Sequence, residues 1–126
     1  LARPLHTRRG CGADFIQLSG EDHTALSFLA AGGHGCISVT ANVAPRLCAE
    51  MHRAWREGRV GEAIGIQDRL VPLHDALFSE TSPGPVKYAA SLLDKATAHC
   101  RLPLAPCGEA TRSRVREAMV GAGLLN

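Results

Sequence analysis

Several cysteines and histidines lie at spacings that could bind a metal ion. Cys48 and His52 are four residues apart and therefore share one face of a helix, and His23, His34 and Cys36 are further possible donors. No set of them has a recognised tetrahedral ligand spacing, and Cys48 falls in an apolar stripe at helical spacing. We therefore expect no metal, and no motif predicts a cofactor.

Lysine is the other residue type that could perform covalent chemistry, because a deprotonated amine attacks carbonyl carbons. The chain has two lysines, Lys87 and Lys95. Lys87 falls in the first turn of a predicted helix, where a solvated or ion-paired surface lysine is the simpler interpretation. Ser19, His74 and Asp75 could form a catalytic triad on paper, but nothing in the sequence brings them together.

The elements that would position a site are two predicted strands. Residues 36–40 form a short β-prone run after the glycine-rich residues 32–35, and residues 13–18 are a second strand candidate. A predicted helix over residues 21–31, with acids at its start, lies between them. Strand, helix and strand make a βαβ unit with parallel pairing, and ligands bind where such strands end.

After residue 40 the pattern predicts helices throughout. Asn42 can cap the first of them, and Pro45 suits a first turn. Apolar stripes and glycine stops predict the helices, including one over residues 1–9 closed by Gly10 or Gly12, one closed by Gly58, one of about 18 residues kinked at Pro72, one starting near Val86 and one around Val115–Ala122.

Composition excludes several classes of protein. With 45% hydrophobic and 21% charged residues the chain is globular, and a net charge of +2 gives no reason to expect a nucleic-acid or membrane partner. Five cysteines without a CxxC motif indicate a reduced, cytoplasmic protein. The chain begins at Leu1 without Met, in helix-like sequence, and we expect a truncated or fragmentary reading frame.

Residues 33–44 (GHGCISVTANVA) resemble the eighth-strand signature of the dihydrodipicolinate synthase (4-hydroxy-tetrahydrodipicolinate synthase) family. Other segments agree in the same order along the chain: residues 18–22 (LSGED), 70–74 (LVPLH), 77–80 (LFSE), 83–87 (PGPVK) and 101–104 (RLPL). The similarity covers nearly the whole chain but only the last part of the family's sequence.

The resemblance implies an α/β fold, namely a partial TIM (β/α)8 barrel, its last two βα units, followed by C-terminal helices. Residues 1–42 would be the last part of the barrel: the end of helix 6, strand 7, helix 7 and strand 8. Residues 43–126 would be helix 8 and the C-terminal helical region. Two strands are too few for a stable parallel sheet in isolation, which agrees with a piece of a larger barrel.

The family's activity is the condensation of pyruvate with aspartate-semialdehyde in lysine biosynthesis, through a lysine Schiff base. By resemblance that lysine would fall about five residues before Leu1, so no catalytic residue is expected in this chain, which would be inactive alone. The resemblance also implies a homo-oligomer, commonly a tetramer, with neither nucleic acid nor membrane as partner.

Two substrate-binding positions follow from the resemblance. Gly20 matches the glycine beside the pyruvate pocket at the end of the seventh strand, and Ile37 matches the eighth-strand residue that contacts the pyruvyl group. A turn glycine and a core β-branched residue are their ordinary structural interpretations. Ser38 and Thr40 are weaker candidates.

Two alternatives remain. The protein could be another pyruvate aldolase of the same superfamily, of the N-acetylneuraminate lyase or keto-acid aldolase type. Alternatively, the chain could exist as such and be a non-catalytic interaction fragment that pairs with barrel halves.

Overall fold

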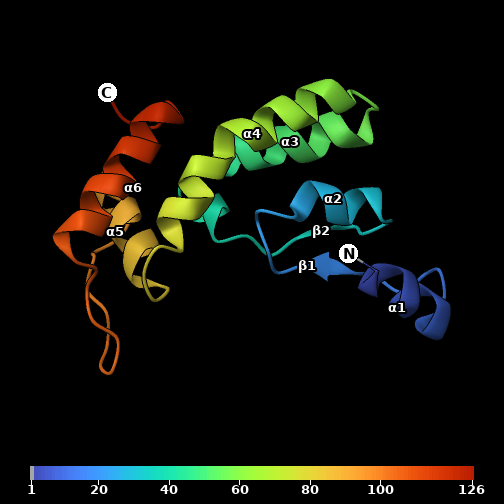
Figure 1. The fold of residues 1–126 in the computed structure, drawn as a ribbon, viewed down its shortest axis with the longest axis horizontal. Coiled ribbons are helices and arrows are strands. Elements are labelled where there is room, and N and C mark those ends of the chain that lie inside the picture. Colours follow the sequence, from blue (N-terminus) through green and yellow to red (C-terminus); the bar gives the residue numbers. More distant parts are fainter. Residues whose placement is uncertain (1) are drawn as a thin grey trace.

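The last two helices lie at one end of the molecule, and a short parallel strand pair lies in the other half, next to the first helix (Figure 1). The structure is a computed structural model and describes residues 2–126. In chain order the elements are α1 (Arg3–Cys11), β1 (Leu18–Ser19), α2 (Ala25–Ala30), β2 (Gly35–Cys36), the 3-10 helix η1 (Thr40–Asn42), α3 (Pro45–Arg56), α4 (Val60–Leu77), α5 (Gly84–Leu92) and α6 (Glu109–Gly121).

The predicted parallel βαβ unit is confirmed. β1 and β2 pair in parallel, with Leu18 opposite Gly35 and Ser19 opposite Cys36, and α2 connects them. The first strand is shorter than the predicted range of 13–18, because β2 is its one neighbour within residues 2–126 and pairs with it only from Leu18 onward.

The prediction of a strand over residues 36–40 is wrong beyond Cys36. The amides of Val39 and Thr40 donate to the side chain of Asp22 instead of to a neighbouring strand. Thr40 then begins η1. A carboxylate from the preceding connection thus ends the strand and turns the chain.

The helix starts also differ in part from prediction. The helix expected over residues 21–31 begins only at Ala25. Asn42 does not cap α3, whose N-cap residue is Ala44, and the Asn42 amide instead donates to the carbonyl of Val39 at 2.9 Å. Pro45 is the first residue of α3, as predicted.

Glycine ends two helices as predicted. Gly12 follows α1 with a φ of 94°, and Gly58 follows α3 with a φ of 74°. Both values lie in a region that side chains with a Cβ rarely adopt, so glycine is suited to these stops. α4 runs continuously through Pro72.

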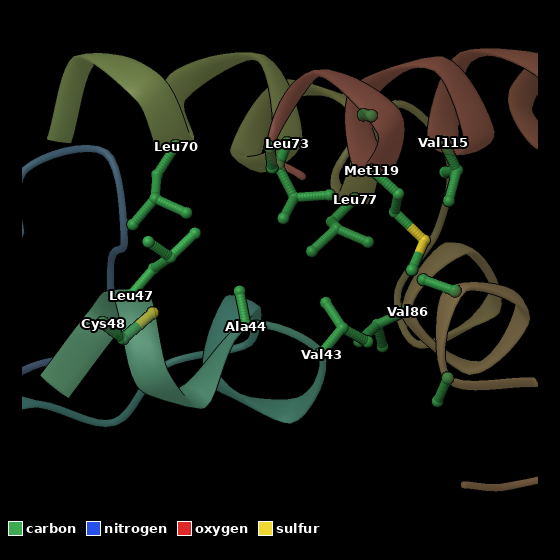
Figure 2. Close-up of a cluster of buried hydrophobic side chains, with 14 residues drawn as sticks. Val43, Ala44, Leu47, Cys48, Leu70, Leu73, Leu77, Val86, Val115 and Met119 are labelled. Carbon is green, nitrogen blue, oxygen red and sulfur yellow. The ribbon is translucent and has the colours of Figure 1, made fainter. Parts of the chain in front are cut away.

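The main hydrophobic core lies among the last four helices and the segment before them (Figure 2). Leu73 and Leu77 of α4 are fully buried, as the predicted stripe requires. They belong to a cluster of Val43, Ala44, Leu47, Cys48, Leu70, Leu73, Ala76, Leu77, Val86, Ala89, Ala90, Val115, Met119 and Ala122. This end of the molecule therefore has a closed apolar interior of its own.

The half of the molecule that holds the strand pair has a much smaller hydrophobic core. A small cluster of Ala25, Leu29 and Met51 attaches α2 to α3. In contrast, four large apolar side chains in and beside the strands are at least half exposed: Phe15, Ile16, Leu18 and Ile37. Within residues 2–126, no helix combines the length and apolar character needed to cross a membrane.

Candidate functional site

The two residues proposed to bind substrate lie at the carboxyl ends of the paired strands. Gly20 follows β1 directly, and Ile37 follows β2 directly. The amide of Ile37 donates to the carbonyl of Ser19 at 2.8 Å, so the two strand ends are joined by a backbone hydrogen bond. Parallel pairing thus brings together positions that are 17 residues apart, since 37 − 20 = 17.

The surroundings of both residues are open. A Cβ placed on Gly20 would meet no atom of residues 2–126 within 4 Å outside its chain neighbours. Ile37 is 72% exposed, and its interpretation as a core residue is wrong for this chain. A small backbone position and a free apolar side chain lie side by side, an arrangement that suits a small ligand with an apolar part.

The carboxylate of Asp22 organises the turn after β2. Its Oδ2 accepts hydrogen bonds from the amides of Val39 at 2.9 Å and Thr40 at 3.2 Å, and its Oδ1 accepts one from the hydroxyl of Ser38. The Ser38 oxygen in turn accepts from the amide of Ala41 at 2.8 Å. Asp22 is 4% exposed, and these donors compensate the burial of its carboxylate.

Two side chains of helix α4 hold this turn in place through hydrogen bonds. The hydroxyl oxygen of Thr40 and Nδ1 of His74 are 2.7 Å apart and form a buried hydrogen bond. The side-chain amide of Gln67 (Nε2) donates to the backbone carbonyls of Asp22 and His23 at 3.1 and 3.3 Å. Burial lowers the pKa of His74, which favours a neutral ring.

A histidine between two carboxylates joins the connection after β1 to α4. His23 Nδ1 lies 2.9 Å from Glu21 Oε1, and its Nε2 lies 2.9 Å from Asp75 Oδ1. The His23 ring also makes an edge contact with that of His74, with centroids 5.2 Å apart. Burial lowers the pKa of His23, but the two carboxylates outweigh it and the pKa is raised. The hydrogen bond with His23 lowers the pKa of Glu21.

The residues considered for a metal site do not form one. Cys36, Cys48 and His52 line a small cavity of about 10 Å³ beside Asp22, and burial raises the pKa of both thiols to about 11. His34 is elsewhere, accepting a hydrogen bond from the amide of Gln17. Within residues 2–126, no three His, Cys, Asp or Glu side chains are placed to hold a metal ion.

The other proposed arrangements are also kept apart. Ser19 bonds to the backbone of Glu21, whereas His74 bonds to Thr40 and Asp75 to His23, so these side chains form no triad. Lys87 is half-buried in the first turn of α5, a helix that lies apart from the strand pair (Figure 1).

Sequence reasoning missed two residues of this site. The sequence predicts Asp22 only as an acid near the start of a helix. It indicates His74 only as one member of a possible catalytic triad with Ser19 and Asp75. The one available signal for Asp22 was that it comes two residues after Gly20, in the connection that follows a predicted strand. No local pattern indicates that residue 74 bonds to residue 40, because 34 residues separate them in the sequence.

Comparison with known proteins gives consistent results. A sequence profile described as the dihydrodipicolinate synthetase family matches residues 1–121. The chain is 67% identical over 125 residues to the 4-hydroxy-tetrahydrodipicolinate synthase of Acidiphilium cryptum, and 68% identical over 127 residues to that of Gluconacetobacter diazotrophicus. These alignments cover 99% and 100% of this chain and 43% of each relative, so the chain spans about two fifths of their length.

A solved structure agrees with the sequence comparisons. The enzyme from Cyanidioschyzon merolae, crystallised with lysine bound, matches 99% of this chain with a TM-score of 0.93 at 33% identity, and the match covers 42% of that chain. The family match therefore extends over nearly the full length of the chain and over its fold. The chain belongs to the dihydrodipicolinate synthetase family.

Proposed function

We propose that this chain is the C-terminal part of a lyase that condenses pyruvate with aspartate-semialdehyde to give 4-hydroxy-tetrahydrodipicolinate. The observation that carries the proposal is the pairing of β1 with β2, which joins the segments of Gly20 and Ile37 through the bond from Ile37 to Ser19. The names of the relatives support this substrate pair over the sugar-acid aldolases.

In this proposal the strands are the seventh and eighth of a TIM barrel, and residues 43–126 form helix 8 and the C-terminal helical region. The exposed apolar side chains of the strand end support it, because a complete barrel would cover them. We place the division between these parts at residue 42; the burial of Val43, the first buried residue of the helical core, supports this choice.

The chemistry would begin with condensation of a lysine amine and the ketone of pyruvate, with loss of water. Loss of a methyl proton from this imine gives an enamine, which attacks the aldehyde carbon of the second substrate. Neither Lys87 nor Lys95 belongs to a strand end. We therefore assign the amine to a residue outside these 126 residues, and we expect the isolated chain to be inactive.

The role of this segment is to form part of the pyruvate pocket. Glycine at position 20 lets the backbone approach the ligand closely, because no Cβ intervenes. Ile37 offers an exposed apolar surface to the three-carbon skeleton of pyruvate. Both contributions concern binding and orientation, and proton transfer is left to other parts of the protein.

Borohydride trapping with pyruvate tests the proposal. Borohydride reduces the imine to a stable secondary amine, which intact mass and peptide mapping detect. We expect an adduct on a lysine outside residues 1–126 of the full-length protein and none on the isolated chain. A specific adduct on Lys87 would show that the assignment of the amine is wrong.

Substitutions test the pocket itself. Gly20→Val places a branched side chain in the proposed pocket and should raise the KM for pyruvate on the order of tenfold or more, since small misplacements are costly. Gly65→Val is the matched control, because Gly65 lies on α4 and a Cβ there also meets nothing within 4 Å. Equal kinetics for the two variants would exclude Gly20 from the pocket.

A second candidate function rests on the exposed strand end. The isolated chain could act as an interaction fragment, because unpaired strand edges with apolar side chains favour association. Sedimentation and binding of a hydrophobic dye measure this behaviour. A monomer that binds no dye and unfolds in one sharp transition would contradict it.

A further inference from the structure

We infer that Asp22 is a positioning residue that fixes Gly20 and Ile37 relative to each other through the turn after β2. The inference rests on the proposed function, and it assigns to Asp22 a role in pyruvate binding without direct contact with the substrate. Asp22 lies two residues after Gly20, and the first residue it holds, Ser38, directly follows Ile37.

The bonds of Asp22 connect two separate segments of the chain. The residue itself belongs to the connection after β1, whereas its three donors lie at successive positions after β2. A single carboxylate has enough acceptor positions for all three donors. Bonds to an ionised acceptor are also stronger than those between neutral groups, so the link is a firm one.

Helix α4 also holds the backbone of Asp22, in addition to the bonds that its side chain makes. Gln67 on α4 donates to the carbonyl of Asp22 at 3.1 Å, and His74, about two turns further along the same face of the helix, bonds to Thr40. Both ends of the Asp22 link are therefore attached to the same helix. The strand pair itself has only two residues in each strand, too little to fix the turn alone.

The neighbouring acid has a different position. Glu21 is exposed and bonded to His23, whereas Asp22 is buried with both oxygens occupied by donors. A buried carboxylate whose oxygens already accept hydrogen bonds from the protein is better suited to holding the backbone in place than to binding a ligand that exchanges with solvent. This contrast identifies Asp22 as the residue that sets the spacing of the pocket.

Asp22→Asn tests the inference with almost no change in volume. The amide group has one acceptor oxygen instead of two, and its NH2 cannot accept from a backbone amide. Because the turn loses hydrogen bonds to a charged acceptor, we expect the kcat/KM for pyruvate of the full-length protein to fall about 10- to 100-fold. The loss should appear mainly in the KM for pyruvate, with the KM for the aldehyde within about twofold.

Two further variants make the test specific. Asp68→Asn removes an exposed carboxyl from α4 and should leave the kinetics unchanged. Ser38→Ala removes one of the three donors to Asp22, together with the acceptor of the Ala41 amide, and keeps both backbone bonds to Asp22. We expect it to lower kcat/KM for pyruvate about 2- to 10-fold, less than Asp22→Asn, because two of the bonds to Asp22 remain.

Amide hydrogen exchange supplies a readout that does not depend on activity. In Asp22→Asn the amides of Val39 and Thr40 should exchange faster, while amides within α6 should be unchanged. Unchanged exchange at Val39 and Thr40 would overturn the inference. Faster exchange with unchanged pyruvate kinetics would overturn the link to binding. If the unsubstituted protein traps no pyruvate, the proposed function itself fails, and with it the role of Asp22 in binding.

Discussion

Replacing His23 by Gln should destabilise the protein near pH 6 but have little effect near pH 8.5. His23 joins the connection after β1 to α4 through Glu21 and Asp75, with both contacts at 2.9 Å. Glutamine can keep some hydrogen bonding but carries no charge. The difference between the two pH values therefore isolates the contribution of the histidine cation.

The magnitude follows from the exposure of the three side chains. The His23 side chain is 33% exposed, and those of Glu21 and Asp75 are 52% and 48% exposed. Solvent therefore screens both pairs, and pairs of this kind contribute about 0.2–1 kcal/mol each. We expect His23→Gln to cost about 1 kcal/mol of unfolding free energy near pH 6.

The sign of the pH dependence follows from the raised pKa of His23 in the folded state. The folded protein holds the proton more tightly than the unfolded chain, whose histidine pKa is about 6.5. The stabilisation is fully present below that value and is lost as the pH rises through the higher pKa of the folded state. Other charged or titratable groups around the ring are His74 on α4 and Asp22 beside it.

Other histidines would obscure a simple pH profile. Burial lowers the pKa of His52 and His74, so their contributions have the opposite sign: stability is present above about pH 6.5 and is lost as the pH falls below it. The comparison is therefore made between variants at the same pH, where the contribution of His52 cancels; that of His74 cancels except for the small part of its pKa shift that comes from His23. His99→Gln is the matched control, because His99 is exposed in the loop before α6.

Urea unfolding of the three proteins at about pH 6 and about pH 8.5 gives the required free energies. The expected result is a destabilisation by His23→Gln that shrinks at the higher pH, with no such change for His99→Gln. A cost for His23→Gln that is equal at both pH values would refute the reasoning, because the cation would then contribute nothing.

Three further predictions concern packing, a buried hydrogen bond and thiol reactivity. Leu73→Ala should cost about 2–5 kcal/mol in urea unfolding, because the side chain is fully buried, whereas Leu102→Ala, at 92% exposure, should cost almost nothing. Thr40→Val should cost about 1–3 kcal/mol by removing the partner of a buried ring nitrogen; an unchanged midpoint would contradict this. Cys11 is exposed and should react with a thiol reagent near neutral pH much faster than Cys36, whose pKa is about 11; equal rates would exclude that protection.

Local signals explain which parts of the fold were predictable. Helices α3, α4 and α6 follow from apolar residues at helical spacing, and Gly12 and Gly58 supply the backbone conformation for a stop within their own segment. The parallel βαβ order also follows from the sequence of element types. None of these features requires knowledge of distant partners.

The strand lengths and the turn after β2 depend on contacts that no local pattern records. Residues 38–40 are as β-prone as the residues before them, but Asp22 takes up their donors from at least 16 positions away. Gly20 and Ile37 were found only through the family resemblance, because a turn glycine and an isoleucine have common structural explanations. Long-range polar contacts thus determine this site, and single-sequence periodicity does not register them.

The attachment of the strand ends to α4 has a consequence for synthesis on the ribosome. Gln67 and His74 bond to Asp22 and Thr40, residues that are translated 45 and 34 positions earlier. The strand ends therefore leave the ribosome before the groups that will hold them exist outside it. The pocket segment is completed only when α4 has emerged, which makes a pause in translation between residues 42 and 74 a vulnerable stage for this protein.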